Sequence, residues 1–322
     1  MNEGWLVCKT TAGYLAGLDE IIIARLQSEK PGVAVMAQTL IRKGGKRIRP
    51  ALLLLAGSFG SSPSKDLLYP AAAMEMIHVA SLYHDDVMDE AAMRRQAPSV
   101  NNAYGNDVAI QAGSFVFARA MSLLADTRTD LGKIISRSVS DLCLGQLRES
   151  EYRHDVSNSV DHYLTVIQQK TASLFELPCS LGTRLAGSGP GTIEALQTYG
   201  KNLGMAFQIV DDLLDLTGDE ATMGKQPGAD LREGVYTFAT LFALNRATVR
   251  KELAGLLLLD RIADEELKRA VSIIKDSGGV GEARRQARNY IKAAEDALEI
   301  LPSTPARESL FNLSKYVTER SK

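Results

Sequence analysis

The sequence predicts an all-α protein that forms a single domain over residues 1–322. Three observations carry this prediction. Apolar residues recur mostly three and four positions apart, alternating β-branched stretches are almost absent, and Ala and Leu are abundant. No stretch is long or biased enough to be an interdomain linker, and no repeat of fixed period is found. We therefore expect one large helical domain.

The same spacing predicts helices along the whole chain. Their ranges are 19–28, 50–58, 69–88, 107–125, 131–153, 160–181, 191–216, 236–249, 265–275, 280–300 and 305–320. Clusters of Gly, Pro and Ser separate many of them. Pro50, Pro70 and Pro305 stand where a helix can begin, because proline is tolerated in the first turn.

Composition indicates an ordinary globular protein, with 45% hydrophobic and 24% charged residues. The formal net charge of −2 gives no general attraction to nucleic acid or to anionic membranes. Cys8, Cys143 and Cys179 form no CxxC pair, which favours reduced thiols in an intracellular protein. No secretory signal is recognised, and apolar runs such as 51–56 are shorter than the roughly 18–20 residues of a membrane span. We expect a cytoplasmic protein without a transmembrane segment.

Two acidic clusters, HDDVMD and VDDLLD, interrupt otherwise apolar sequence. Asp85 and Asp89 are four residues apart, as are Asp211 and Asp215, so in a helix each pair lies on one face about one turn apart. Like charges at this spacing destabilise a helix mildly, so each cluster needs a cation. Paired carboxylates suit Mg²⁺, which keeps several waters and bridges to substrate phosphates. The alternative for either cluster alone is an acidic helix end or a salt-bridged surface face.

Basic residues accompany both clusters and could hold anionic groups. They lie in a Gly-opened loop before a helix, just after the first cluster, within a later apolar stretch and shortly after the second cluster. They are Lys46, Arg47 and Arg49; Arg94 and Arg95; Lys170 beside Thr171; and Lys225. Each alone is compatible with a solvated surface charge, but together with two metal clusters they indicate a site for more than one polyphosphate.

In this order the motifs resemble those of the polyprenyl synthetase family, the trans-isoprenyl diphosphate synthases. The similarity extends from about Val33 to Arg320. The motifs that carry it are GGKRIRP, HDDVMDEAAMRR, GQLRE, KTASLF, FQIVDDLLD and GKQPGADLREG. The resemblance implies a bundle of about 10–13 helices of the isoprenoid synthase type around a deep central cavity. It also implies that the aspartate clusters face each other across the mouth of that cavity, usually in a homodimer.

The resemblance further implies the reaction, which is head-to-tail elongation by a polyprenyl diphosphate synthase. An allylic diphosphate loses diphosphate with the help of Mg²⁺, with about three ions per active site. The double bond of isopentenyl diphosphate attacks the resulting carbocation, and a proton is then lost. This prenyltransferase chemistry of isoprenoid biosynthesis needs no nucleophilic side chain, and no Ser/His/Asp or Cys/His arrangement indicates one.

By resemblance, each motif position takes a role. The metal ligands are Asp85, Asp89 and Asp211, supported by Asp86, Asp212 and Asp215. The residues that contact the allylic diphosphate are Arg94, Lys170, Gln208 and Lys225, and Thr171 joins the substrate-binding residues. The residues that bind isopentenyl diphosphate are Lys46, Arg49, His78 and Arg95. The residues expected to be catalytic are Asp85, Asp89, Lys170, Asp211 and Lys225.

The chain departs from the family pattern in two places. In 234-GVYTFA-239, Val235 stands in place of a lysine near the allylic diphosphate, and Ala239 in place of a proline. Gln96 follows the RR pair where a glycine is common. Because some long-chain members also lack the lysine, we interpret its loss as a difference of subtype.

Small side chains before the first aspartates indicate a long product. In the family, a Phe or Tyr there closes the cavity, whereas this chain has Ala80 and Ser81. Ser81 lies one turn before Asp85, while Ala80 points more to the side. We expect a product of about C30 or longer, with geranylgeranyl diphosphate as the alternative product. Ordinary close helix packing is the other explanation of the two small residues.

Two other functions are considered. A class I terpene cyclase shares the DDxxD motif, but its usual second metal motif, NxxxSxxxE, does not appear and a second DDxxD does. A non-catalytic subunit of a heteromeric synthase would have lost aspartates or basic residues, and this chain keeps nearly all of them. Val235 is the one feature that favours the second alternative.

Overall fold

The computed structural model describes residues 4–61, 65–95, 97–125, 131–218, 227–259 and 261–319. These residues are almost entirely helical, and a single short antiparallel hairpin is their only sheet. The all-α prediction is confirmed. The chain forms two compact units. Unit 1 comprises Met1–Ile135, Leu177–Leu196 and Leu301–Leu310, and unit 2 comprises Ser136–Glu176, Gln197–Ile300 and Phe311–Lys322. That they make up one domain over residues 1–322 stays a prediction.

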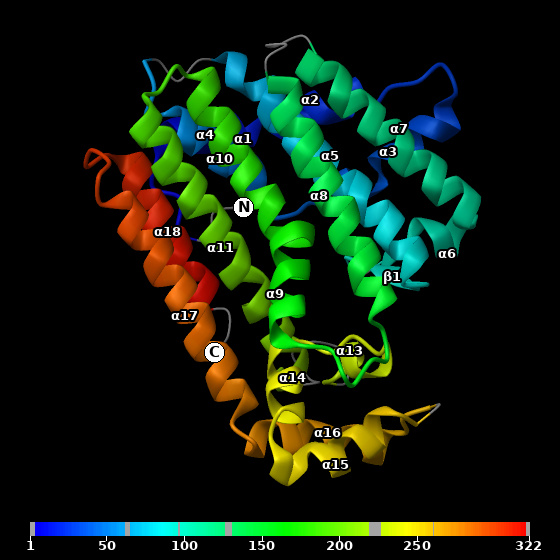
Figure 1. The fold of residues 1–322 in the computed structure, drawn as a ribbon. Helices are drawn as coiled ribbons and strands as arrows, with labels where there is room; N and C mark the ends of the chain where they lie inside the picture. Colours follow the sequence, from blue (N-terminus) through cyan, green and yellow to red (C-terminus); the bar gives the residue numbers. More distant parts are fainter. Residues whose placement is uncertain are drawn as a thin grey trace. The chain divides into compact units, whose positions relative to one another are not determined.

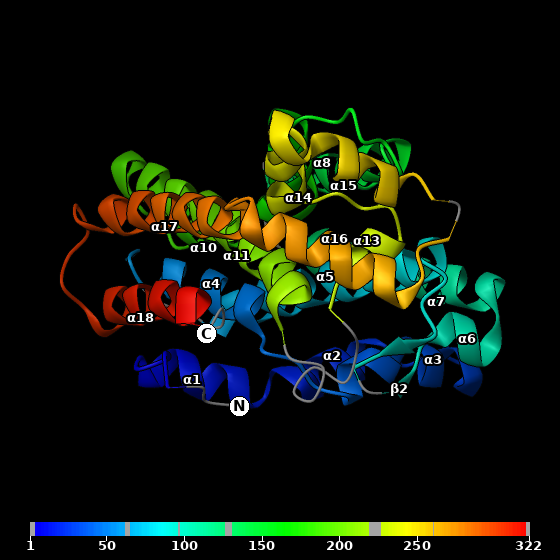
Figure 2. The ribbon, with the colours of Figure 1, turned by 90° about the horizontal axis from the view of Figure 1, so that it is seen from below.

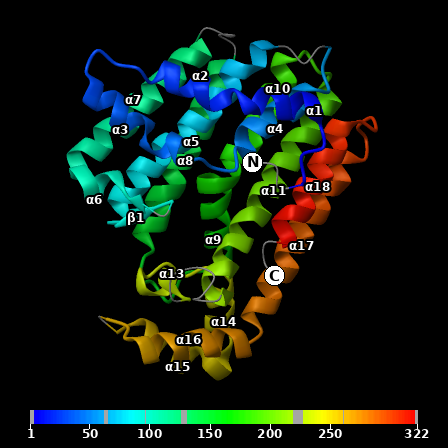
Figure 3. The ribbon, with the colours of Figure 1, turned by 180° about the vertical axis from the view of Figure 1, so that it is seen from behind.

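Unit 1 is built around the long helix α5, which Figure 1 labels together with its neighbour α7. Its elements are α1 Lys9–Ala16, α2 Leu18–Arg25, α3 Pro31–Arg42, α4 Ile48–Gly57, a 3-10 turn Lys65–Leu67, α5 Leu68–Met88, α6 Val100–Tyr104 and α7 Asn106–Ala125. In its first turns α5 carries Ala, Met, Ile and Val, most of which are buried. The helix packs against α7, α4 and α2. Figure 3 shows α2 beside α5.

Several elements of unit 1 were not predicted. They are α1, α3, α6 and the hairpin of β1 Met93–Arg94 with β2 Ala97–Pro98. The segment of α3 mixes β-branched residues with Gly and Pro, and its intrinsic helix propensity is weak. Its buried positions, from Ala34 to Ile41, follow the spacing of one helix face, so packing rather than propensity stabilises it.

Helix α7 is long and apolar enough to cross a membrane by length and composition, alone among the helices in the described ranges. Of its most apolar window, 39% is buried, and it packs against α5, α6 and α3. Packing within unit 1 therefore accounts for part of its apolar character. The absence of a transmembrane segment stays a prediction.

Unit 2 contains most of the second half of the chain. Its elements are most of α8 Gly132–Glu151, α9 Val160–Ile167, a π-helical turn Gln168–Ala172, α13 Ala229–Arg232, α14 Phe238–Leu244, α15 Ala247–Leu257, α16 Asp264–Asp276 and α17 Gly279–Leu298. Helices α10 Ser173–Leu185, α11 Pro190–Thr217 and α18 Pro305–Glu319 have residues in both units. Helix α14 packs against α17, α15 and α9, and Figure 2 shows α15 next to α16.

The expected helix over 236–249 is wrong as one element, because it divides into α14 and α15. The expected helix over 160–181 is helical throughout and consists of α9, the π-helical turn and the first part of α10. At this turn the backbone of Lys170 comes very close to α8, because a β-carbon built on Gly145 would lie only 2.4 Å from the Lys170 amide nitrogen. The widened turn and the glycine opposite it place Lys170 against α8.

Candidate active site

The first acidic cluster occupies the carboxyl end of α5. Asp85 and Asp89 are both partly exposed, and the Asp89 amide donates to the Asp85 carbonyl over 2.9 Å as the helix ends. The carboxyl end of a helix carries partial negative charge from its last carbonyl groups. Two carboxylates at this end therefore create a local field that favours a cation.

Asp86, between them, is buried and ion-paired. Its carboxylate is 1% exposed, and Oδ1 accepts from Arg94 Nε over 2.7 Å, with Arg94 Nη2 2.6 Å away. Burial raises the pKa of Asp86, and the Arg94 guanidinium opposes that rise. Oδ2 is buried and has no hydrogen-bond partner among the described residues. Such an acceptor fits a cation or a water bound to one.

Unit 1 contains all four residues predicted for isopentenyl diphosphate. His78 lies on α5 within electrostatic reach of Arg49, Arg95 and Arg94. Burial and these guanidinium groups lower the pKa of His78 well below its ordinary value. Burial likewise lowers the pKa of Arg49 to about 10. Lys46 lies exposed on the adjoining loop.

The second acidic cluster lies near the carboxyl end of α11, in unit 2. Asp211 is exposed, whereas Asp212 and Asp215 are buried. Asp212 accepts hydrogen bonds from the Tyr163 hydroxyl and, over 2.7 Å, from Gln208 Nε2. Burial raises the pKa of Asp212 to about 7, although both donors act to lower it. Asp215 accepts from the backbone amide of Asp230 over 3.1 Å.

The residues around this cluster form one hydrogen-bond chain. Thr171 Oγ1 donates to Gln208 Oε1 over 2.7 Å, and Gln208 in turn donates to Asp212. Lys170, in the π-helical turn, is ion-paired through Nζ with Glu149 of α8. The predicted residues Lys170, Thr171, Gln208 and Asp212 thus belong to one unit. Lys225 lies outside the described residues.

Val235 lies beside the second acidic cluster. It lines a cavity of about 40 Å³ together with Glu149, Tyr163, Gln208 and Asp212. A lysine at this position would lie among carboxylates and amides, and valine replaces that cation with an apolar surface. Glu149, which lines the same cavity, is ion-paired with Lys170.

The small residues before the first cluster differ in exposure. Ala80 is 2% exposed, whereas Ser81 is partly exposed and its hydroxyl donates to the His78 carbonyl over 2.8 Å. Tyr83 is fully buried, and its hydroxyl donates to the Met36 carbonyl of α3 over 2.7 Å. The Tyr83 ring therefore points toward α3.

The acidic clusters offer only part of a metal's ligand shell. In the described part of the chain, no group of three or more His, Cys, Asp or Glu side chains comes together as a metal site. Mg²⁺ usually takes one or two protein carboxylates and completes its octahedron with waters and phosphate oxygens. Asp85, Asp89 and Asp211 fit that pattern as accessible carboxylates, and the buried Asp86, Asp212 and Asp215 carry internal bonds. Whether the clusters of the two units face each other stays a prediction.

Sequence reasoning missed several residues of this site. Glu149 is ion-paired with Lys170, and Tyr163 donates a hydrogen bond to Asp212. Gln146 is buried, and its side-chain amide has no hydrogen-bond partner among the described residues. The GQLRE motif contained Gln146 and Glu149, and an acidic residue in that motif was the available signal. Tyr163 carried no such signal, because its role depends on the packing of α9 against α11 residues.

The lowered pKa of His78 predicts how stability depends on pH. The folded state binds fewer protons than the unfolded state below about pH 6.5, so the free energy of unfolding falls as the pH falls through that range. The contribution is at most about 1.4 kcal/mol per pH unit, reduced because the ring is partly exposed. In a His78→Gln variant, the loss of stability between about pH 7 and pH 5 is therefore smaller by about 1 kcal/mol. Denaturant unfolding at both pH values measures it, and equal losses in variant and wild type contradict it.

Comparison with known proteins agrees with these arrangements. The family model described as polyprenyl synthetase matches residues 30–274. A nonaprenyl diphosphate synthase of Mycobacterium tuberculosis is 38% identical over 283 residues, which cover 87% of this chain and 84% of that protein. A heptaprenyl diphosphate synthase component 2 of Bacillus subtilis is 33% identical, covering 92% of this chain and 84% of that protein.

A solved structure extends the likeness to the whole fold. The polyprenyl synthase of Caulobacter crescentus, in complex with calcium and isoprenyl diphosphate, is 33% identical with a TM-score of 0.91. The match covers 98% of this chain and 97% of that one. The expected isoprenoid synthase fold is confirmed, and the family uses divalent metal with diphosphate substrates. The chain belongs to the polyprenyl synthetase family.

Proposed function

We propose that this chain condenses isopentenyl diphosphate with an allylic diphosphate and makes a polyprenyl diphosphate of about C30 or longer. The observation that carries the proposal is the shared build of the two acidic clusters. In each, the second aspartate (Asp86 or Asp212) is buried and bonded within its own unit, while an accessible aspartate stands beside it. In that arrangement the accessible aspartates would bind metal ions, and the buried aspartates would hold the accessible ones in position.

The accessible carboxylates would hold Mg²⁺. Asp85 and Asp89 would contribute from α5, and Asp211 from α11, with about three ions serving one active site. When bound, Mg²⁺ stabilises the negative charge that develops on the leaving diphosphate. Asp86 and Asp212 then act as supports, because their oxygens are engaged by Arg94, Tyr163 and Gln208.

Cationic side chains would bind the two diphosphates. Arg94, Lys170, Gln208 and Lys225 would contact the allylic diphosphate, with Thr171 holding Gln208 through its hydroxyl. Glu149 keeps Lys170 in place by an ion pair. Lys46, Arg49, His78 and Arg95 would bind isopentenyl diphosphate, with His78 donating as a neutral imidazole.

The chemistry needs charge stabilisation and the exclusion of water. The allylic C–O bond breaks with its electron pair leaving on diphosphate, and the double bond of isopentenyl diphosphate attacks the cation. Loss of a proton then forms the new trans double bond. Fixed charges act on the leaving group without reorganisation, and an apolar surrounding prevents water from capturing the cation.

We also propose a homodimer. On α7 of unit 1, Ile110 is 41% exposed, and on α8 of unit 2, Leu144 and Leu147 are 46% and 54% exposed. Exposed apolar side chains on two long helices are typical of protein–protein contact surfaces. The relative named as a component 2 favours a heteromeric alternative, in which this chain needs a second subunit. We also propose that the protein is cytoplasmic.

An elongation assay tests the function directly. The purified protein, incubated with isopentenyl diphosphate, Mg²⁺ and dimethylallyl, geranyl, farnesyl or geranylgeranyl diphosphate, should give products of about C30 or longer by mass spectrometry. Removing metal with EDTA should abolish turnover, and Mg²⁺ should restore it. No elongation with any primer contradicts the proposal. A C15 or C20 end product contradicts only the chain length and favours the short-chain alternative.

The metal assignment predicts the effect of Asp85→Asn. Loss of one carboxylate should lower kcat by about a hundred- to thousandfold, because charge on the leaving diphosphate is less well stabilised. The matched control is Asp276→Asn, at an exposed aspartate of α16 that accepts from Ser272. Full activity of the Asp85 variant, or equal loss in both, contradicts the assignment.

The length assignment predicts the effect of Ser81→Phe. An aromatic ring one turn before Asp85 should stop elongation early and shift the product to fewer isoprene units. Val35→Phe on α3, where Val35 is 59% exposed, serves as the control. If Ser81→Phe lowers activity without shortening the product, ordinary helix packing explains the small residue instead.

A further inference from the structure

Arg47 is a buried cation at the N-terminal cap of α4, and residues on both sides of it are assigned to substrate. Its side chain is 3% exposed, and its backbone is left-handed with φ of 52°. A residue other than glycine in this region is strained, and such strain persists only where surrounding contacts impose it. Lys46 and Arg49, on either side of it, are the cations proposed for isopentenyl diphosphate.

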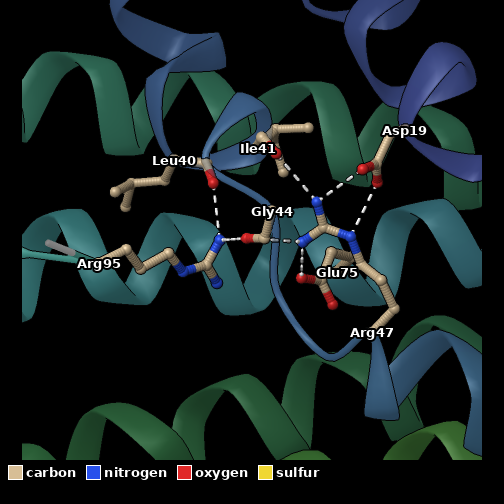
Figure 4. Close-up of polar contacts among 7 residues, drawn as sticks. All are labelled: Asp19, Leu40, Ile41, Gly44, Arg47, Glu75 and Arg95. Carbon is tan, nitrogen blue, oxygen red and sulfur yellow. Dashed lines mark hydrogen bonds and ion pairs between the residues drawn. The ribbon is translucent and has the colours of Figure 1, made fainter. Parts of the chain in front are cut away.

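Two carboxylates and the backbone carbonyls of Ile41 and Gly44 hold the Arg47 guanidinium, as Figure 4 shows. Nε and Nη2 donate to the two oxygens of Asp19 on α2, over 2.8 and 3.0 Å. Nη1 donates to Glu75 Oε1 on α5 over 2.6 Å, and Nη2 also reaches the Ile41 carbonyl over 3.0 Å. Glu75 is itself 3% exposed.

Such a buried ion network is a costly way to stabilise a fold. Removing charges from water costs several kcal/mol per ion, and apolar side chains of similar size are often as stable. The network therefore indicates a role in specifying one conformation rather than in stability alone. The conformation it specifies is that of the loop from Gly44 to Arg47.

A second guanidinium clamps this loop from its other side. Arg95 Nη1 donates to the Leu40 carbonyl over 2.6 Å and also to the Gly44 carbonyl. A β-carbon on Gly45 would lie 2.9 Å from Arg47 Nη1 and 3.1 Å from Arg95 Nη2. The loop backbone is thus threaded between two cationic side chains, and Gly44 and Gly45, with φ of 81° and 156°, make that path possible.

Glu75 links this network to the proposed diphosphate site. It precedes His78 by three residues on α5 and so lies on a neighbouring part of the same helix face. Its charge acts favourably on the guanidinium groups of Arg49 and Arg95 as well as on Arg47. One buried carboxylate therefore serves as a shared counterion for three arginines.

We propose that Arg47, with Glu75 and Asp19, is a positioning residue that fixes the loop so that Lys46 and Arg49 meet the diphosphate of isopentenyl diphosphate together. This inference rests on the proposed function. Arg47 itself does not touch substrate, because its donors are used by protein acceptors. Its removal should weaken the binding of isopentenyl diphosphate selectively and leave the binding of the allylic diphosphate unchanged.

The test compares Arg47→Lys and Asp19→Asn with Arg42→Lys, a control on the same segment whose exposed side chain binds only Gln38 of its own helix in the hydrogen bonds described. Lysine keeps the charge of Arg47 but cannot form the forked contacts. We expect the KM for isopentenyl diphosphate to rise about tenfold in Arg47→Lys and less in Asp19→Asn, with the allylic KM changed less than about twofold. Calorimetric binding of isopentenyl diphosphate alone should weaken in parallel, and Arg42→Lys should match wild type.

Thermal melting of each variant separates positioning from general loss of structure. Asp19→Asn removes a partly exposed partner of Arg47, so this variant still tests the role of the network if Arg47→Lys does not fold. A folded variant with unchanged affinity for isopentenyl diphosphate overturns the inference. Equal weakening for both substrates, in step with melting temperature, overturns it as well. If the wild-type protein neither binds nor elongates these substrates, the proposed function itself is refuted. This outcome is distinguishable from failure of the inference about Arg47, because it is seen in the wild-type protein.

Discussion

The ion pair between Arg94 and the buried Asp86 shows the constraint on which each acidic cluster depends. A carboxylate can be removed from water only if donors satisfy it. In unit 1 the donor is a guanidinium from the hairpin after α5, and in unit 2 Asp212 is satisfied by a tyrosine hydroxyl and a glutamine amide. Their neighbours Asp85 and Asp211 are more accessible, and these are the carboxylates that we propose as metal ligands.

The same constraint explains the acidic residues that accompany the cationic ones. Lys170 has Glu149, and Arg47 has Glu75 and Asp19. A site for two diphosphates must gather positive charge before its ligands arrive, and uncompensated cations repel one another. The carboxylates paired with these cations lower that repulsion.

Much of this arrangement could be predicted from the sequence, and the failures have physical causes. Regular apolar spacing identified α5, α7, α11 and α17 to within a few residues. Helix α3 was missed because its propensity is weak and packing stabilises it. The π-helical turn at Lys170 was missed because it depends on the close approach of α8, which no local pattern records. Arg47 looked like another loop cation, and its burial among partners distant in sequence could not be anticipated.

The sequence by itself determined the helical class, the two acidic clusters and the order of motifs that identifies the family, because spacing along a helix decides which residues share a face. Tertiary structure alone decided which charged residues are committed internally and which remain accessible. Asp85 and Asp86 are adjacent and chemically identical, yet one is partly exposed and the other is buried against Arg94. The direction of each side chain around α5 separates them, and only the packing of neighbouring elements determines what each direction meets.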